Sequence, residues 1–176
     1  MFKIILIGLA AIIVIFLIVV AMQPAEFTVK RGAKIAAPAS VLFDHTNDLQ
    51  KWNEWSPWAK MDPETKVTYE GPPSGPGSSF SWVSKKTGEG TMTNIDTVPG
   101  QSLRFRLDFR KPFAATNTAV FTFTPEGDET NVEWSMSGRN NFFFKAFSLF
   151  MDCDKMIGGD FEKGLASLKA IAEAKP

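Results

Sequence analysis

Residues 102–109 have the sequence Ser-Leu-Arg-Phe-Arg-Leu-Asp-Phe, in which apolar side chains alternate with polar or charged ones. Successive side chains of a strand point to opposite faces of a sheet, so this stretch predicts a strand with one apolar and one solvated face. The same period of two recurs in six other places: residues 27–35, Val67 and Tyr69, Phe80 and Trp82, residues 92–98, Phe121 and Phe123, and residues 132–136. Turn sequences such as Gly71-Pro72-Pro73 and Pro99-Gly100 separate several of these places. Strands joined by short turns predict an antiparallel meander.

Beyond Gly138 the apolar side chains recur at steps of three, four or seven, which predicts one stripe along a long C-terminal helix. The stripe consists of Phe147, Phe150, Met151, Ile157, Phe161, Leu165, Leu168 and Ala172. Two short helices are predicted before the meander: Pro38-Ala39-Ser40 opens the first, and the second presents Trp52 and Trp55 on one face until Pro57 ends it. Because an apolar sheet face and an apolar helix stripe must cover each other, we predict an α+β fold, a curved antiparallel sheet wrapped around the long C-terminal helix.

The N-terminal segment from Ile4 to Met22 has 19 residues and no charge. As a helix it would extend about 28 Å, close to the hydrocarbon thickness of a bilayer. A cleaved signal peptide is the alternative, but its apolar core is normally only about 7–15 residues long and ends at a small-residue cleavage site. Ala21-Met22-Gln23-Pro24 is a poor site of that kind, so we expect an uncleaved anchor over residues 1–25 and a folded domain over residues 26–176.

The charges that flank the apolar segment give opposing signals for its orientation. Lys3 favours an N-terminus inside the cell, whereas Lys30, Arg31 and Lys34 favour the reverse. Because the N-terminal tail is very short, we expect a single-pass membrane protein whose domain lies outside the cytoplasm.

The composition excludes several classes of protein. The chain has 176 residues, with 19 Lys and Arg against 19 Asp and Glu, so no basic excess is present to neutralise a phosphate backbone and we expect no nucleic-acid partner. Hydrophobic residues make up 44% and charged residues 22%, which excludes intrinsic disorder. His45 and Cys153 are the only histidine and cysteine. Since neither stands in a metal-binding motif, we expect no metal and no cofactor.

Five motifs of the body stand in a recognisable order. They are Ala36-Ala37-Pro38-Ala39-Ser40-Val41-Leu42-Phe43, Trp52-Asn53-Glu54-Trp55-Ser56-Pro57-Trp58, the Gly-Pro-rich turn at 71–77, Val132-Glu133-Trp134-Ser135-Met136-Ser137-Gly138, and Asp160-Phe161-Glu162-Lys163-Gly164-Leu165 with Leu168-Lys169. Together they resemble the Bet v 1/START-related superfamily, also called SRPBCC, and within it the small bacterial proteins described as polyketide cyclase/dehydrase-like. The resemblance covers about residues 27–175 and implies a helix-grip fold with a hydrophobic cavity, which carries many unrelated functions.

The aromatic side chains provide the candidate ligand-binding residues. The chain has 16 Phe and 5 Trp but only 1 Tyr, so its rings rarely carry a hydroxyl. Seven of these rings are expected to lie between the sheet and the helix: Phe80, Trp82, Phe105, Phe121, Phe123, Trp134 and Phe161. A packed core is the alternative for each ring. If the space is incompletely filled, it forms an apolar pocket for a small hydrophobic, lipid-like or polycyclic ligand.

Asp154 is three residues from both Met151 and Ile157, which places a carboxylate on the apolar stripe. A carboxylate there needs a partner or a raised pKa. Gly158 is one turn further along, and together with Gly159 it indicates either a kink or room beside the sheet. Two interpretations stay open: Asp154 lies near a helix end or pairs with an arginine, or Asp154 and Gly158 belong to the ligand site, with Asp154 as the candidate catalytic residue.

Three functional hypotheses follow. The leading one is a membrane-anchored, non-catalytic domain that binds a hydrophobic or lipid-like ligand in an internal cavity. The first alternative is a polyketide cyclase- or dehydratase-like enzyme that uses a polar cavity residue, and the second is an interaction module whose interior is packed solid. The apolar run Phe142-Phe143-Phe144 fits core, a lid or a wedge that touches the membrane.

Overall fold

The computed structural model describes residues 2–174, so Met1, Lys175 and Pro176, which the predicted segments 1–25 and 26–176 include, lie outside the described residues. The elements are, in order, α1 Phe2–Met22, β1 Glu26–Ile35, α2 Ala39–Asn47, α3 Trp52–Trp55, α4 Pro57–Met61, β2 Lys66–Glu70, β3 Ser79–Ser84, β4 Gly88–Val98, β5 Ser102–Lys111, β6 Ala115–Glu126, β7 Glu129–Arg139, α5 Phe142–Ser148 and α6 Cys153–Glu173.

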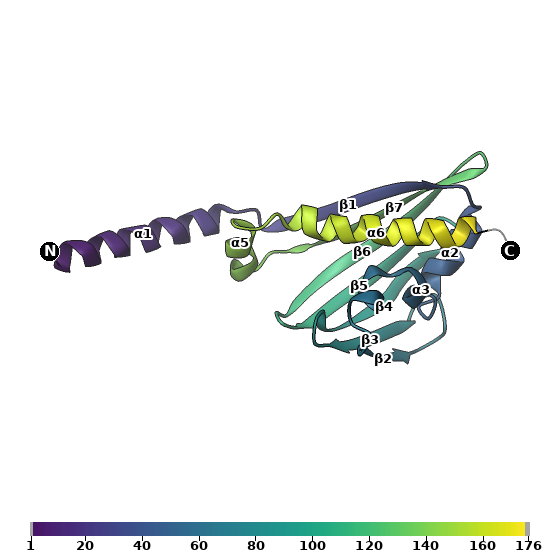
Figure 1. The fold of residues 1–176 in the computed structure, drawn as a ribbon, viewed down its shortest axis with the longest axis horizontal. Helices are drawn as coiled ribbons and strands as arrows, with labels where there is room; N and C mark the ends of the chain where they lie inside the picture. The colour runs from purple at the N-terminus through teal and green to yellow at the C-terminus, as the bar shows by residue number, and fades with distance from the viewer. Residues whose placement is uncertain (1, 175–176) are drawn as a thin grey trace.

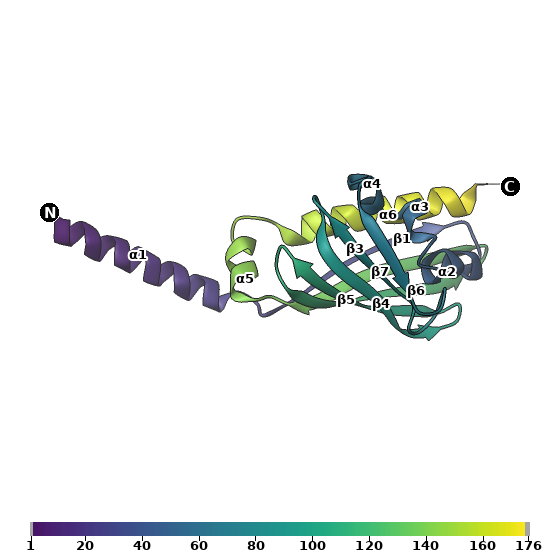
Figure 2. The ribbon, with the colours of Figure 1, turned by 90° about the horizontal axis from the view of Figure 1, so that it is seen from below.

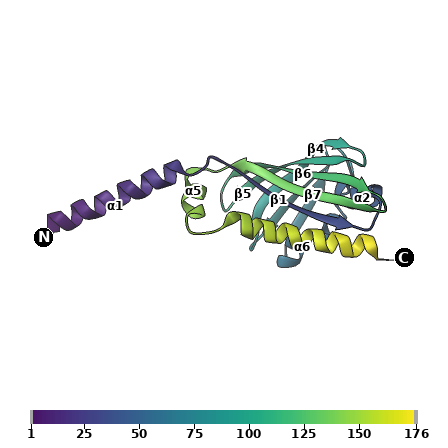
Figure 3. The same ribbon diagram turned by 90° about the horizontal axis from the view of Figure 1, so that it is seen from above.

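Within the described residues, seven strands form one antiparallel sheet in the order β1-β7-β6-β5-β4-β3-β2. Consecutive strands from β2 to β7 are neighbours, and β1 pairs with β7 and forms one edge of the sheet. Helix α6 lies along the sheet, nearest to β1 (Figures 1 and 3). The predicted α+β fold, a curved antiparallel sheet around a long C-terminal helix, is confirmed.

The indole of Trp134, on β7, joins the sheet to α6. Its ring stacks on Phe161 of α6 with centroids 4.1 Å apart and an angle of 7° between the planes, and on Phe121 of β6 at 4.8 Å. Gly164 makes this approach possible, because a Cβ at that position would lie 2.8 Å from a ring carbon of Trp134. The stack therefore fixes the spacing between helix and sheet.

Two tryptophans of α3 fill the part of the interior that adjoins α2. Trp52 and Trp55 are buried, and their indole N–H groups donate to α2 carbonyls, from Trp52 to Thr46 at 2.6 Å and from Trp55 to His45 at 3.1 Å. The core around them contains Ile35, Leu42, Phe43, Leu103, Phe105, Phe121, Phe123, Val132, Leu165 and Leu168. This half of the molecule is a closely packed core.

The long C-terminal helix begins later than the predicted stripe. Phe147 belongs to the short helix α5, and Phe150 and Met151 lie in the turn that follows, outside α6. Asp152 caps α6, because its carboxylate accepts a hydrogen bond from the Lys155 backbone N–H at 3.0 Å. A carboxylate at this position satisfies an N–H that the helix start leaves free, which favours a new helix at Cys153 over continuation of α5.

Helix α1 extends away from the body at the end opposite the C-terminus (Figures 1 and 2). Almost all its side chains are exposed, and Val20, near its end, is buried. Of the helices described, α1 is the one that is long and apolar enough to cross a membrane, although a signal sequence would pass the same test.

The glycines of α6 give a test of the close packing on Trp134. Gly159→Ala adds a methyl group with nothing within 4 Å, so it is expected to raise the free energy of unfolding by up to about 1 kcal/mol through helix propensity. Gly164→Ala meets Trp134 and Pro57, and overpacking is expected to lower that free energy by about 1–3 kcal/mol. Denaturant unfolding of the full chain in detergent measures both, and a stabilising Gly164→Ala would contradict the close approach.

Candidate functional site

A cavity of about 420 Å³ lies between the sheet and α6, in the half of the molecule away from α2. Its walls come from all seven strands and from α3, α4, α5 and α6, and most of the lining side chains are apolar. One row of cross-strand partners runs across its inner wall: Asn117, Leu107, Met92 and Phe80. The register of the sheet therefore places residues from four neighbouring strands around one space.

Trp52 separates the cavity from the packed core. Its ring lies edge-on to Phe105 at 5.5 Å, Phe121 at 5.7 Å and Trp134 at 6.0 Å, and 6.5 Å from Phe80. Trp52 itself lines the cavity, whereas Phe105 and Phe121 do not. The side chain that was expected only to build a helix face thus forms the floor of the cavity.

The nine residues predicted to bind the ligand fall into three groups. Phe80, Trp82, Trp134 and Phe161 line the cavity. Phe105, Phe121 and Phe123 lie in the packed core. Asp154 and Gly158 lie outside the cavity wall, against Arg31 of β1. The structure thus brings four of the nine together around the cavity, and their role in binding stays a prediction.

Arg31 explains the placement of Asp154 and Gly158. The Arg31 guanidinium donates to Asp154 at 2.9 Å and to Glu162 at 2.8 Å, and these carboxylates stand one turn on either side of Gly158. A Cβ on Gly158 would lie 2.1 Å from Arg31 Nη2, so glycine provides the room for the guanidinium. Of the two open interpretations for Asp154, pairing with an arginine near a helix end is the arrangement observed.

The electrostatics of this pair follow from its geometry. The hydrogen bond from Arg31 is the main cause that lowers the pKa of the Asp154 carboxyl below its usual value, and the positive charge of the guanidinium lowers it further. The Asp154 side chain is 59% exposed, which limits the contribution of the ion pair to stability. The pair fastens the start of α6 to the edge strand β1.

The cavity wall contains polar atoms that lack a partner within the described residues. Asn117 is 8% exposed and its Oδ1 accepts no hydrogen bond there, and Trp134 Nε1 is likewise buried without an acceptor. Gly138 leaves the room for the Asn117 amide, because a Cβ at Gly138 would lie 2.1 Å from Asn117 Oδ1. Unpaired buried polar atoms cost free energy. Both residues line the cavity, but these two atoms have essentially no accessible surface, so they lie within the wall and are not exposed to the cavity.

Most of the exposed residues of the cavity lining gather at the end of the sheet where β7 leads into α5, and we take this end as the mouth of the cavity. Asn117 pairs with Gly138 and Phe109 with Ala115, so the loop between β5 and β6 stands level with the end of β7. The lining residues at this end are Lys111, Pro112, Phe113, Arg139, Asn140, Phe144 and Met156. The cavity is therefore apolar inside and carries two basic side chains near its entrance.

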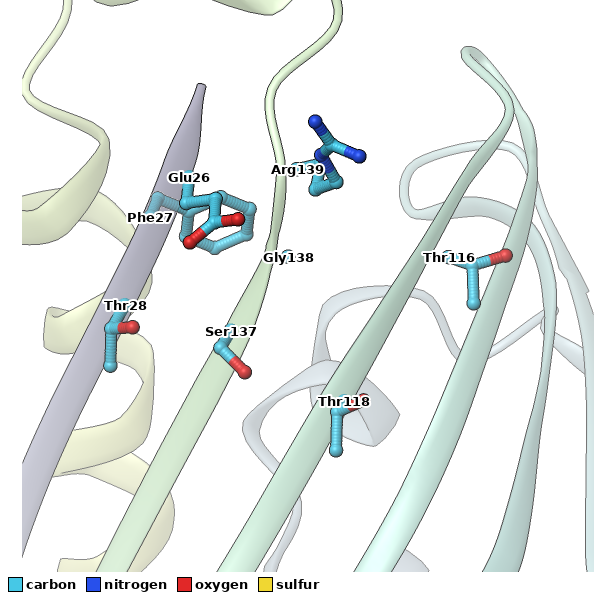
Figure 4. A pocket seen from close by; sticks show the side chains of 8 residues that line it. All are labelled: Glu26, Phe27, Thr28, Thr116, Thr118, Ser137, Gly138 and Arg139. Atoms are coloured by element: carbon cyan, nitrogen blue, oxygen red, sulfur yellow. The ribbon is translucent and has the colours of Figure 1, made fainter. Parts of the chain in front are cut away.

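A second hollow, of about 250 Å³, lies on the outer face of the sheet over β1, β7 and β6 (Figure 4). Its floor carries the hydroxyl groups of Thr28, Ser137, Thr116 and Thr118. These side chains alternate with the inward-facing ones and form the solvated face predicted from the sequence pattern. They add no chemistry to the cavity on the other side.

A curved sheet that grips one helix and encloses an apolar cavity defines the helix-grip class of proteins. The chain belongs to the family described as "Polyketide cyclase / dehydrase and lipid transport", whose model matches residues 26–173. The resemblance stated from the motifs is thereby confirmed. No curated protein matches the chain.

Solved structures with the same fold come from several sources. Protein CV1439 from Chromobacterium violaceum has a TM-score of 0.61 and 13% identity, and the match covers 84% of this chain and 98% of that one. The Aha1 dimer from Colwellia psychrerythraea has a TM-score of 0.60 and 13% identity, with 84% and 96% covered. The di-domain ARO/CYC StfQ from the steffimycin biosynthetic pathway has a TM-score of 0.64 and 12% identity, with 85% and 51% covered. At these identities the likeness shows the fold alone.

The ion pair between Asp154 and Arg31 gives a pH-dependent prediction. Because the pKa of Asp154 is lowered in the folded state, its contribution to stability is present above the usual Asp pKa of about 3.9 and is lost as the pH falls through the folded pKa. Asp154→Asn should therefore lower the midpoint of thermal unfolding at neutral pH, and the difference from the unmodified chain should vanish in acid.

Asp128→Asn, in the exposed turn between β6 and β7, is the matched control and should leave the midpoint nearly unchanged. Thermal unfolding of the full chain in detergent, measured from neutral to acidic pH, decides the point. A difference between Asp154→Asn and the unmodified chain that persists in acid would contradict the ion-pair explanation.

Proposed function

We propose that the chain is a membrane-anchored protein that binds a small hydrophobic or lipid-like ligand in the cavity under α6 and acts by binding rather than by catalysis. The observation that carries the proposal is the apolar space of about 420 Å³ above Trp52. That volume falls within the usual range of ligand pockets. A solidly packed interaction module, the second alternative from the sequence, is disfavoured because this half of the interior is not filled by side chains.

The cavity lining supports a ligand with an apolar body and one hydrogen-bonding group. Apolar side chains such as Leu107, Phe109 and Met92 surround most of the space. Asn117 is a polar side chain among the apolar residues of the wall, and its amide suits a hydrogen-bonding group of the ligand. Arg139 at the mouth suits an acidic or phosphate group. A single-chain amphiphile combines these features.

Helix α1 supports the anchoring part of the proposal. It is 21 residues long, which is enough to cross a bilayer, and nearly all of it lies free of the body. A helix this apolar would be unstable in water with its side chains exposed, so a bilayer is the environment that its composition favours. We propose a single-pass anchor over residues 1–25, with the binding domain over residues 26–176 on the outer side.

A cyclase- or dehydratase-like activity is the second candidate function, and the family description is what favours it. It would need a polar group inside the cavity. Asp154 lies outside the wall, whereas Asp160 lines it and its Oδ1 accepts a hydrogen bond from Lys163 at 3.0 Å. Asp160 and Asn117 are therefore the residues to replace if turnover of an aromatic polyketide is found.

Filling the cavity tests the binding proposal. The full chain in nanodiscs is titrated with N-phenyl-1-naphthylamine, and energy transfer from the cavity tryptophans reports the probe inside the cavity. Ala119→Phe projects a ring into the space and should weaken binding about tenfold, or about 1.4 kcal/mol. Thr118→Phe, its neighbour on the outer face of β6, should leave binding unchanged.

Thermal unfolding shows whether each variant is folded, and Ala115→Phe, nearer the mouth, replaces Ala119→Phe if the latter does not fold. Equal affinity in the inward and outward variants would exclude the cavity as the binding site. Mass spectrometry of lipid extracted from the purified chain gives an independent readout, and protein that carries no ligand and ignores the probe would count against the proposal.

A further inference from the structure

Large apolar side chains are exposed together around the mouth of the cavity. This aromatic rim consists of Phe113, Phe142, Phe143, Phe147, Phe150, Met151 and Met156, each at least 38% exposed. It comes from the loop between β5 and β6, from α5 with the turn after it, and from the first turns of α6. The Phe113 ring packs on Phe143 at 4.7 Å, which joins the first two parts into one surface. Contiguous apolar patches of this kind mark interaction sites.

The aromatic rim is continuous with the cavity wall. Phe113 and Met156 belong both to the exposed rim and to the lining of the cavity, and Phe144 lines the cavity from the inner side of α5. A ligand that leaves the cavity at this end therefore passes directly onto the rim. Whatever binds to the rim therefore also lies at the opening of the cavity.

The rim is held beside the last turns of α1. Phe150, which is 78% exposed, lies with its ring 6.4 Å from that of Phe16, and Lys145 of α5 donates to the carbonyl of Ala21 at 3.4 Å. Only three residues separate α1 from β1, and Asn140 donates from its backbone N–H to Ala25 at 2.8 Å. The position of α1 relative to the rim is therefore fixed by contacts on both sides of the linker.

This geometry sets the depth of the rim in a bilayer. Phe16 stands six residues before Met22, which corresponds to about 9 Å along the helix axis. The apolar run from Ile4 to Met22 is only just long enough to cross the hydrocarbon region, so Phe16 must lie inside that region when α1 spans the membrane. Phe150, beside Phe16, is then brought to the boundary between acyl chains and headgroups, where amphipathic segments insert by about 5–10 Å.

We propose that the aromatic rim inserts into the surface of the bilayer that α1 crosses, so that the cavity opens onto the membrane and takes up a single-chain amphiphile directly from it. This inference rests on the proposed function, and it adds the source of the ligand and its route of entry. Lys145, with its ammonium at the end of α1, stands where a lysine reaches the headgroup region while its carbon chain remains in apolar surroundings.

Site-directed spin labelling of the full chain tests the position of the rim. In a Cys153→Ser background, a nitroxide is attached at Phe143→Cys, at Ile12→Cys in α1 and at Asp128→Cys in the turn at the far end of the sheet. The chain is placed in nanodiscs of phosphatidylcholine and phosphatidylglycerol. We expect the labels at 143 and 12 to collide with oxygen, which concentrates in lipid, and the label at 128 to collide with a water-soluble nickel chelate.

The three positions separate the possible failures. If the label at 12 is accessible to the nickel chelate, α1 does not span the bilayer and the anchoring part of the proposed function fails. If the label at 12 lies in lipid but the label at 143 is as accessible to nickel as the label at 128, the insertion of the rim is overturned while the anchor stands.

Uptake of a probe tests the route of entry. Dansyl-labelled lysophosphatidylcholine is mixed into the nanodiscs, and energy transfer from the cavity tryptophans follows its entry. Charging the rim with Phe143→Glu and Phe150→Glu together, neither of which lines the cavity, should slow uptake about tenfold because glutamates resist insertion into the boundary. Val98→Glu, a 40% exposed side chain at the far end of β4, should not slow uptake.

Affinity for N-phenyl-1-naphthylamine keeps the two proposals apart. The doubly charged rim variant should bind this probe at equilibrium as the unmodified chain does. Unchanged uptake of the lysolipid in that variant would overturn entry through the rim. If the unmodified chain does not bind N-phenyl-1-naphthylamine at all, the cavity proposal itself is overturned.

Discussion

The stack of Trp134 between Phe121 and Phe161 is the contact on which the rest of the structure depends. It sets the distance between α6 and the sheet, and Gly164 allows that distance to be short. Once the helix is held there, the space on one side of the stack is narrow enough for side chains to fill it. On the other side the sheet curves away and the same helix position leaves a gap, so one contact defines both the core and the cavity.

The sizes of the inward-facing side chains explain why the cavity lies at one end. Toward α2 the strands present large rings and branched residues, and the two tryptophans of α3 fill what remains. Toward the mouth the inner face carries small residues, among them Ala115, Ala119, Gly138 and Gly90. At Gly90 a Cβ would lie 2.4 Å from the ring of Trp82, so glycine there lets an aromatic ring lie flat against the sheet. An empty apolar cavity costs stability, and a bound ligand offsets that cost.

The sequence pattern predicted the regular elements because period two and period three to four report which side of an element is buried. It also identified four of the rings around the cavity. It offered pairing with an arginine as one interpretation of Asp154 but could not identify the arginine. The partner is Arg31, which is 123 residues away and interrupts the apolar face of β1 between Val29 and Ala33. Asn117 interrupts the inner face of β6 in the same way, and such interruptions are the signal that could have identified it. The division of the interior into core and cavity depends on how rings from different elements interlock, and single-chain periodicity carries no information about that.

A cavity that opens onto a bilayer competes with the bilayer for its ligand. Burial of the ligand's chain gives little net gain in that case, because lipid tails are as apolar as the side chains of the cavity. Selectivity must then come from shape and from polar contacts that the hydrocarbon cannot offer. Trp52 limits the depth of the cavity, Asn117 places an amide group in its wall and Arg139 a charge at the mouth. These three residues, rather than the numerous apolar ones, are therefore expected to determine which molecule the cavity holds.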